Sequence, residues 1–306
     1  MRVFHSPNYY ADIGEHVMPI RKFNLVRSEI EASGLPVSIE APEPVTDEQL
    51  LRVHTREYIE AIRTGQPIEL AQSQKFPWSP ALAEAVRWTN GGNIAALRVA
   101  LDEGVAGNLA SGFHHSHETR GEGYCTFNGL IVAAEQVKAE GRLRRILVVD
   151  MDLHYGNGTA LLLAKRPEFF QLSIYGNWYD NNLAHRDVAA RRTPDTDNAW
   201  SIPVPNGAGR DEYLGILAES LPRAIDRARP DAILFQAGAD PYKEDPYSPL
   251  DLDHDALMDR DRFVFAAGKR QGIPVMWVLA GGYTKDVQKV VTVHVNTCRA
   301  ACEVYC

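Results

Sequence analysis

The sequence predicts a single α/β domain over residues 1–306, in which a doubly wound parallel sheet carries helices on both faces. Helical and strand-like segments alternate along the 306 residues, no Pro- or Ser-rich linker divides them, and the strand-like segments are almost continuously apolar. Continuously apolar strands are typical of a parallel sheet that is buried on both faces. Such a sheet carries its functional site at the carboxyl ends of its strands.

The strands of this sheet are expected at seven places in the chain: 2–6, 36–41, 105–110, 145–150, 169–174, 232–237 and 274–280. Residues 176–210 form the longest stretch without a regular pattern. A long irregular loop usually shapes a site or moves. We therefore expect 176–210 to do one or the other.

Capping residues mark the starts of several helices. Thr46 begins a capping-box pattern, and Asn128 can cap a helix over 129–140. Ser79-Pro80 predicts the start of a long helix, which Gly91-Gly92 interrupts. Because glycine inside a helix costs about 1 kcal/mol per residue, the pair indicates either close packing or a break between two helices.

Composition limits the class of protein. Hydrophobic residues make up 45% and charged residues 24% of the chain, and the net charge is -8. A nucleic-acid-binding protein would usually be basic. The chain contains no run of about 18 apolar residues, so no membrane span is expected. Its first residues lack the apolar core of a signal peptide, which predicts a cytoplasmic location.

The four cysteines show no metal or redox motif. They are Cys125, Cys298, Cys302 and Cys306, and no two form a CxxC pair. The last three are spaced four residues apart and would share one face of a helix. We expect a partly buried stripe of thiols on the last helix, and the sequence assigns it no role.

Metal-ligand residues follow two of the predicted strands. Asp152 and His154 come just after the strand at 145–150, and Asp240 follows the strand at 232–237. If the extended backbone continues past its strand, Asp152 and His154 point to the same side. Three protein ligands with a fourth position open to water are typical of catalytic zinc. Zinc lowers the pKa of its bound water to about 7, which provides a nucleophile.

Proton-transfer residues follow two further strands. His114 and His115 lie in the loop after 105–110, and Tyr283 follows Gly281-Gly282 after 274–280. Adjacent histidines point in different directions, so both can reach one substrate only if the loop bends. Histidine suits general acid–base catalysis, and a tyrosine O–H can donate to a developing oxyanion.

Each histidine needs a partner that orients its other ring nitrogen. Asp150 and Asn157, which flank the metal-ligand candidates, are the natural choices. His117, two residues beyond the histidine pair, is expected to face solvent.

These segments, in this order, resemble a known family. The matching pieces are Gly112-Phe113-His114-His115, Gly123-Tyr124-Cys125-Thr126-Phe127-Asn128, Asp150 to Thr159, Ala237-Gly238-Ala239-Asp240 and Gly281-Gly282-Tyr283. The chain is similar over nearly its whole length to the arginase-like deacetylases, which include histone deacetylases, acetylpolyamine amidohydrolases and acetoin-utilisation proteins. The short length and the Arg120-to-Cys125 segment resemble class IV histone deacetylases most.

The resemblance implies a role for each site residue. Asp152, His154 and Asp240 would bind Zn2+, although Fe2+ or Co2+ could also serve. His115 would be the general base and His114 its electrostatic or acid partner. Asp150 would orient His114, Asn157 would orient His115, and Tyr283 would polarise the acyl carbonyl. Asn157 stands where class I enzymes carry Asp, which should make His115 less basic.

The resemblance also implies substrate and cation sites. Gly123 and Tyr124 would line an acyl-lysine tunnel opposite Trp178 or Tyr179, and Lys22 would lie near a product-release channel. A structural K+ would be held at Asp150, Asp152, His154 and Ser173.

The predicted function is zinc-dependent hydrolysis of an N-acyl amide, most simply an acyl-lysine carrying an acetyl or a longer fatty acyl group. An acetylpolyamine or another small acylated amine is the alternative substrate. A binuclear manganese ureohydrolase would need a second carboxylate two residues beyond Asp240, where the chain has Tyr242. A non-catalytic acyl-ligand-binding protein would not need the histidine pair. Acyl length, physiological substrate and oligomeric state are left undecided.

Overall fold

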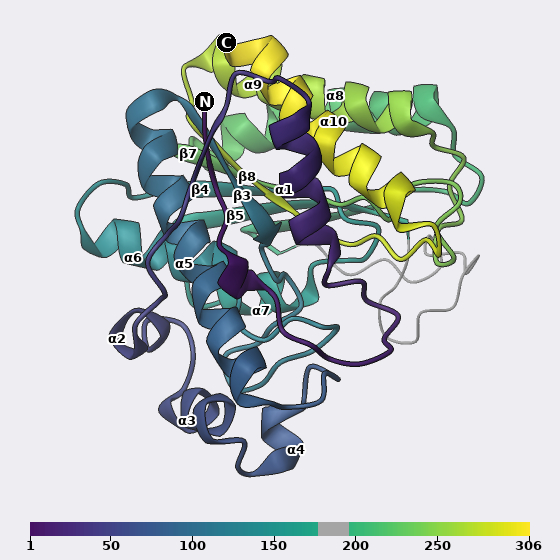
Figure 1. Cartoon of the computed structure of the whole chain (residues 1–306). Helices are drawn as coiled ribbons and strands as arrows, with labels where there is room; N and C mark the ends of the chain where they lie inside the picture. Colours follow the sequence, from purple (N-terminus) through teal and green to yellow (C-terminus); the bar gives the residue numbers. More distant parts are fainter. Residues whose placement is uncertain (177–195) are drawn as a thin grey trace.

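The computed structural model describes residues 1–176 and 196–306, and one eight-stranded, wholly parallel sheet forms its centre (Figure 1). In chain order, the strands are β1 (Arg2–Phe4), β2 (Ser38–Glu40), β3 (Val105–Ser111), β4 (Ile146–Asp150), β5 (Phe169–Tyr175), β6 (Ala199–Pro203), β7 (Ala232–Ala237) and β8 (Val275–Leu279). Across the sheet they lie in the order β2-β1-β3-β8-β7-β4-β5-β6. The prediction of a doubly wound parallel α/β fold is confirmed.

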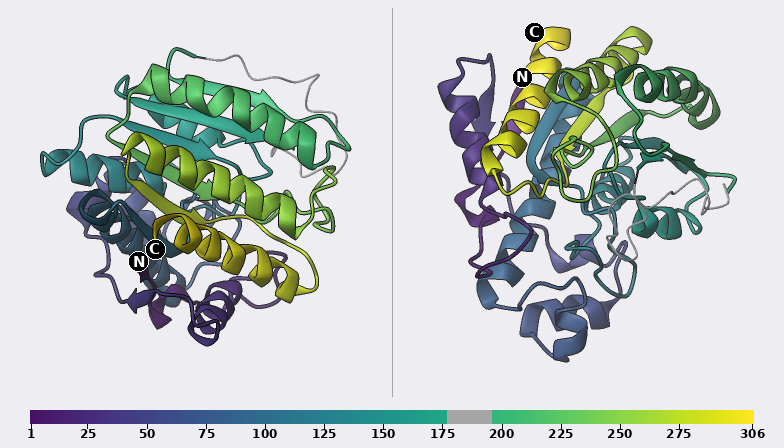
Figure 2. Two further views of the ribbon diagram at one scale, coloured as in Figure 1. Left: turned by 90° about the horizontal axis from the view of Figure 1, so that it is seen from above. Right: turned by 90° about the vertical axis from the view of Figure 1, so that its right-hand side faces the viewer.

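Helices cover both faces of the sheet. One face carries α1 (Lys22–Ala32), α8 (Arg210–Ala228), α9 (His254–Gln271) and α10 (Val287–Tyr305), and the last three lie side by side in Figure 2. The other face carries α5 (Pro80–Glu103), α6 (Gly129–Ala139) and α7 (Asn157–Leu163). The short elements η1 (Pro7–Tyr9), α2 (Asp47–Leu50), α3 (Arg56–Thr64) and α4 (Ile68–Ala71) complete the described chain.

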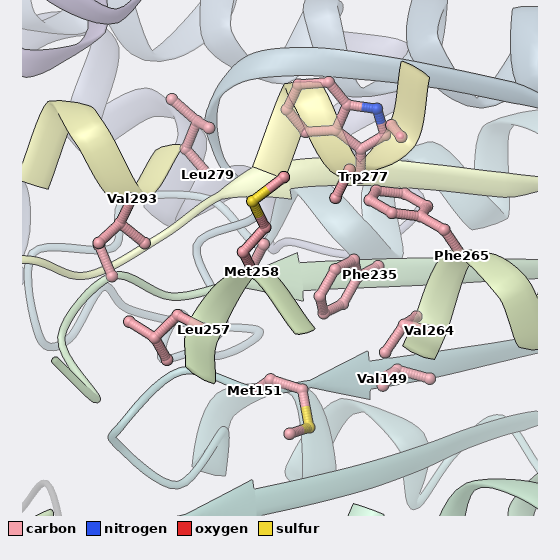
Figure 3. Packing of buried hydrophobic residues seen from close by; sticks show 14 of the residues in the cluster. Val149, Met151, Phe235, Leu257, Met258, Val264, Phe265, Trp277, Leu279 and Val293 are labelled. Atoms are coloured by element: carbon pink, nitrogen blue, oxygen red, sulfur yellow. The ribbon is translucent and has the colours of Figure 1, made fainter. Parts of the chain in front are cut away.

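The core consists of two apolar layers, one on each side of the sheet. In β4, Leu147 and Val149 belong to the layer under α8, α9 and α10, whereas Ile146 and Val148 belong to the layer under α5 and α6. Successive side chains of a strand point to opposite faces, so a strand buried on both faces is apolar throughout. Figure 3 shows one layer, where Phe265 of α9 packs on Phe235 of β7 with ring centroids 5.6 Å apart.

Most predicted elements are confirmed, with small shifts at their ends. Thr46 forms the complete capping box, and the side chain of Asn128 accepts from the backbone N–H of Ile131. The long helix α5 runs unbroken through Gly91-Gly92. A Cβ on Gly91 would lie 1.8 Å from the carbonyl oxygen of Glu43. Close packing is therefore the reason for this glycine pair.

One strand was not predicted. β6 lies inside 176–210, which the sequence pattern left irregular, and pairs in parallel with β5 at the edge of the sheet. Its five residues, Ala-Trp-Ser-Ile-Pro, include Ser201 and Pro203 and so lack the continuous apolar run of the central strands.

The last helix carries the expected thiol stripe. Cys298 and Cys302 are buried in α10, while Cys306 at its end is exposed. The amino group of Met1 lies 3.9 Å from Sγ of Cys306, so the two chain ends are neighbours. None of the helices in the described residues is both long and apolar enough to cross a bilayer.

Candidate active site

Four adjacent strands in the middle of the sheet deliver the candidate site residues. β3, β8, β7 and β4 are neighbours in this order, although β3 and β8 are far apart in the sequence (Figure 1). Their carboxyl ends lead respectively to the His114-His115 pair, Tyr283, Asp240 and the Asp152/His154 pair. Because all the strands are parallel, these ends meet at one edge of the sheet.

The candidate metal ligands converge on one point. One ligand atom from each of Asp152, His154 and Asp240 lies within 4.8 Å of the others, and all three residues are buried. Nδ1 of His154 is 3.2 Å from Oδ1 of Asp152 and 3.0 Å from Oδ2 of Asp240. This is the one such group of three or more His, Cys, Asp or Glu side chains in residues 1–176 and 196–306.

The backbone after β4 turns instead of staying extended, so the expected reason for this convergence was wrong. β4 ends at Asp150, whose Oδ1 accepts from the N–H of Asp152 at 3.2 Å. Oδ1 of Asp152 in turn accepts from the N–H of His154 at 2.9 Å. Two successive side-chain-to-backbone turns of this kind present Asp152 and His154 together.

Backbone donors hold the second oxygen of each carboxylate. The N–H of Gly281 donates to Oδ2 of Asp152 at 2.8 Å, and the N–H of Leu153 donates to Oδ1 of Asp240 at 2.9 Å. A Cβ on Gly281 would lie 1.9 Å from Oδ2 of Asp240, so this position needs glycine. The remaining oxygens turn towards the ring of His154, an arrangement that suits a cation bound by one nitrogen and two oxygens.

The electrostatics of these three residues also favour a cation. Burial and the charge of Asp152 raise the pKa of Asp240 to about 6. Burial alone would lower the pKa of His154, but hydrogen bonds to Asp152 and Asp240 raise it to about 10. Two carboxylates this close and this buried repel each other, and a divalent ion would remove that repulsion.

The histidine pair lies in a bent loop, as a shared substrate requires. Phe113, just before the pair, has φ 61°, and the two imidazole centroids are 4.0 Å apart. Nδ1 of His114 lies 2.7 Å from Oδ2 of Asp150, and Nδ1 of His115 lies 2.6 Å from Oδ1 of Asn157. Each histidine therefore has the orienting neighbour named from the sequence.

The two histidines have opposite proton affinities. Burial lowers the pKa of His114, but the charges of Asp150 and Asp152 outweigh this effect and raise it above its ordinary value. Burial and the neighbouring rings of His114 and His154 lower the pKa of His115 well below 6.5. His114 therefore holds its proton more tightly than an ordinary histidine, and His115 holds one less tightly. Groups whose environments push their pKa values apart are typical of acid and base partners.

Tyr283 faces the same site. Its backbone N–H donates to Oδ2 of Asp245 at 2.7 Å, and its ring centroid lies 6.1 Å from that of His154. Burial and the nearby carboxylates raise the pKa of Tyr283 well above 10, so its phenol stays a hydrogen-bond donor at neutral pH.

A small pocket of about 20 Å³ opens between these residues, and Gly123, Tyr124 and Met18 also line it. A second, apolar cavity of about 30 Å³ adjoins it and shares Met18, Phe113 and Tyr124. Phe76 stacks on Tyr124 with ring centroids 5.5 Å apart, a wall residue that sequence reasoning missed. Trp178 and Tyr179, named as the opposite tunnel wall, lie outside the described residues.

Two further sites were expected from the resemblance: a product-release channel near Lys22 and a potassium site that includes Ser173. Lys22, at the start of α1, is fully buried, donates to the carbonyl of Ala280 at 2.6 Å, and does not line the small pocket. Burial lowers its pKa to about 8. For the potassium site, Ser173 lies opposite Asp150 in the β4–β5 register, and its Oγ accepts from the N–H of Gly156 at 3.4 Å.

A second expectation about the site, the exposure of His117, is also wrong. His117 does not face solvent: its side chain is 13% exposed and its Nε2 contacts Oε2 of Glu122. The same carboxylate oxygen accepts from Nδ2 of Asn157 at 3.2 Å. Sequence reasoning missed Glu122 because no local spacing relates it to Asn157, 35 residues later.

Comparison with known proteins agrees with this architecture. The pattern of the Histone deacetylase domain family matches residues 16–298. An uncharacterised protein of Picosynechococcus sp. is 31% identical over 310 residues, which cover 99% of each chain. The histone deacetylase-like amidohydrolase of Pseudomonas aeruginosa is 29% identical over 271 residues, or 85% of this chain and 70% of that protein. The solved structure of an acetylpolyamine aminohydrolase from Burkholderia pseudomallei has the same fold, with a TM-score of 0.76 at 20% identity over 98% of both chains.

Proposed function

The chain belongs to the histone deacetylase domain family, whose members are hydrolases, and on this basis we propose that it hydrolyses N-acyl amides, with a short-chain acyl-lysine as substrate. The observation that carries the proposal is the meeting of three buried metal-ligand atoms with two differently oriented histidines at four adjacent strand ends.

Asp152, His154 and Asp240 would hold the metal. One nitrogen and two carboxylate oxygens suit zinc, and Fe2+ or Co2+ could take the same ligands. When bound, zinc would supply a Lewis acid for the acyl oxygen and a water of lowered pKa. A structural K+ near Asp150 and Ser173 is part of the same proposal.

The side chains around this metal site would divide the proton transfers between them. His115, neutral at neutral pH, would take the proton of the attacking water, while Asn157 holds its Nδ1. Tyr283 would donate its phenol hydrogen to the oxygen that becomes negative in the transition state. His114, whose pKa the charges of Asp150 and Asp152 raise, would give a proton to the leaving amine.

The size of the pocket favours a short acyl group. The small pocket and the apolar cavity enclose about 20 and about 30 Å³, and a cavity that holds one water needs about 10–15 Å³ of comparable volume. A long acyl chain would need Met18, Phe113 and Phe76 to move apart. A short acyl group would need less of this movement than a long one, which supports acetyl-lysine or a small acetylated amine.

A binuclear ureohydrolase has less support. The position two residues beyond Asp240 is Tyr242, whose O–H lies 2.8 Å from Oε1 of Glu244 and so bonds away from the metal-ligand group. Within the described residues, that group has three members.

The decisive experiment is to measure kcat/KM for one lysine peptide bearing acetyl, butyryl, octanoyl or myristoyl groups, with and without a chelator. We expect chelator-sensitive activity that peaks at acetyl and is lost in His115→Ala. Activity that rises with chain length would refute the short-acyl part of the proposal. If all four peptides were inert while acetylated polyamines were hydrolysed, the substrate would be a small amine. Silence on both classes would contradict the function itself.

A further inference from the structure

A chain of polar contacts extends from His115 to a carboxylate that the proposed reaction does not use. Nδ1 of His115 lies 2.6 Å from Oδ1 of Asn157, and Nδ2 of Asn157 lies 3.2 Å from Oε2 of Glu122. Nε2 of His117 contacts the same oxygen of Glu122, and Nη2 of Arg120 lies 3.8 Å from it. The Glu122 side chain is 23% exposed and that of His117 is 13% exposed, so solvent screens these contacts only in part.

The amide of Asn157 can face His115 in two orientations, whereas a carboxylate in its place would offer only acceptors. The amide of Asn157 has a donor end and an acceptor end, and either can face a neutral imidazole. If the oxygen faces Nδ1, that nitrogen must carry the ring hydrogen and the lone pair lies on Nε2. If the amide were reversed, the hydrogen would lie on Nε2, and His115 could not accept a proton there. The hydrogen bond on one ring nitrogen sets the tautomer of the other.

A carboxylate removes this ambiguity because it accepts hydrogen bonds and donates none. With Glu122 on its far side, the amide of Asn157 must present its donor end to Glu122 and its acceptor end to His115. The negative charge of Glu122 also stabilises the imidazolium that forms when His115 takes up a proton. Only the side chain of Asn157 lies between the two groups.

The backbone holds Glu122 firmly in this position. Its N–H donates to the carbonyl of Cys125 at 3.1 Å, and its carbonyl accepts from the N–H of Cys125 at 2.8 Å. Next to it, the N–H of Gly121 donates to Oγ of Ser73 at 2.9 Å. Because hydrogen bonds fix the backbone at Gly121 and Glu122, the Glu122 carboxylate can set the orientation of the Asn157 amide instead of adapting to it.

We propose that Glu122 is a positioning residue that fixes the orientation of the Asn157 amide and thereby the tautomer of His115. The importance of this tautomer for turnover rests on the proposed function. The tautomer itself can be observed without any substrate.

The first experiment is 15N NMR of the zinc-loaded protein with labelled histidine, at neutral pH, where the ring of His115 is neutral. The His115 signals are identified by their loss in His115→Asn. We expect the Nδ1–H tautomer in the parent protein and a large share of the Nε2–H tautomer in Glu122→Met. An unchanged Nδ1–H tautomer in Glu122→Met would overturn the proposal.

The second experiment exchanges the amide of Asn157 and the carboxylate of Glu122 in a double-mutant cycle. Glu122→Met should lower kcat about 10- to 100-fold with KM unchanged, the usual range for a partner behind a metal-site residue. Glu122→Gln, the single variant that completes the cycle, should lower kcat as well. Asn157→Asp alone should also lower kcat, because it sets two carboxylates against each other. Glu122→Gln combined with Asn157→Asp should restore kcat to within a few-fold of the parent, since the new amide donates to the new carboxylate.

Additive losses in the double variant would contradict a positioning role. The matched control is Glu118→Met in the same loop. Glu118 pairs with Lys165 at 2.5 Å, away from Asn157, and its substitution should leave both kcat and the His115 tautomer unchanged. A parent protein without any amidase activity would count against the proposed function, and the NMR experiment would then decide the role of Glu122 alone.

Discussion

Among single residues, the two adjacent histidines illustrate how surroundings decide chemistry. His114 and His115 are identical side chains in one turn, yet one lies against a carboxylate and the other against an amide. The carboxylate raises the pKa of His114, while burial lowers that of His115. The difference in proton affinity between the two rings thus comes from the carboxylates beside His114 and from the burial of His115 among other imidazole rings.

The phenol of Tyr283 gives a prediction at the same scale. Tyr283→Phe should lower kcat at least about 100-fold, because removal of one oxyanion donor costs about 3–4 kcal/mol in the barrier. KM and the free energy of unfolding should hardly change, since the bond to Asp245 uses the backbone N–H that phenylalanine keeps. Steady-state kinetics and urea unfolding measure both effects.

The control for this substitution is Tyr242→Phe, which removes a buried phenol that bonds Glu244 and not the site. Near-normal turnover by Tyr283→Phe, or an equal loss in the control, would remove the phenol of Tyr283 from the mechanism.

At the scale of elements, the start of α6 depends on a buried histidine. Nε2 of His54 accepts from the backbone N–H of Asn128, the capping residue of α6, at 3.0 Å. The ring also packs on Phe127, with centroids 5.1 Å apart. Burial lowers the pKa of His54 to about 3, so this contact requires the neutral ring. The loop from Cys125 into α6, and with it the wall of the pocket, therefore rests on an uncharged His54.

This dependence predicts a pH effect on stability. The folded pKa of His54 lies below the unfolded value of about 6.5, so its contribution is present above 6.5 and is lost as pH falls towards about 3. The unfolded state binds one more proton in this window, which costs about 1.4 kcal/mol per pH unit. His54→Gln keeps an acceptor for Asn128 but cannot titrate.

The measurement is urea unfolding of the parent and His54→Gln at several pH values in this window, at one metal concentration. The parent should lose stability relative to the variant as pH falls. Other titrating groups are the same in both proteins and cancel in the difference. A difference that stays constant with pH would show that His54 does not titrate as its burial requires.

For the whole molecule, the sheet order is what assembles the site. β8 and β7 insert between β3 and β4, and so bring residues more than 100 positions apart in the sequence to one edge. Gly281 after β8 donates to Asp152 after β4, and Lys22 of α1 donates to Ala280 beside it. The metal-ligand group therefore joins segments from both ends of the chain, and an ion bound there would tie them together.

Metal removal should accordingly destabilise the entire fold. Zinc at about 100 times its Kd adds about 2.7 kcal/mol, which corresponds to about 4 °C in Tm for a domain of this size. Chelation should lower Tm by this amount and zinc should restore it. Because the pKa of His154 is raised to about 10 and that of Asp240 to about 6, protons compete for both ligands, and zinc affinity should fall as pH drops, most steeply below 6.

Asp240→Asn provides the control, since its Tm should respond far less to chelator or zinc. Calorimetric scans and zinc titrations at several pH values test both statements. If complete removal of the metal left the Tm of the parent protein unchanged, this would contradict a bound ion at this site.

The sequence by itself determined the fold class, seven of the eight strands and the identity of the converging side chains. Buried parallel strands must be apolar on both faces, and catalytic side chains must follow them, so both leave local patterns such as Asp150 to His154. The edge strand β6 left no such pattern, because its five residues include Ser201 and Pro203 and form no continuous apolar run.

Only the tertiary structure decided how these parts meet. The close packing at Gly91 and the contact of Glu122 with Asn157 depend on segments distant in the sequence. The turn that joins Asp152 to His154 is local, but its side-chain-to-backbone bonds form no periodic pattern. A hydrogen bond between residues 35 positions apart has no periodicity that a sequence could display. It exists because the sheet and its loops bring the two backbones to that distance.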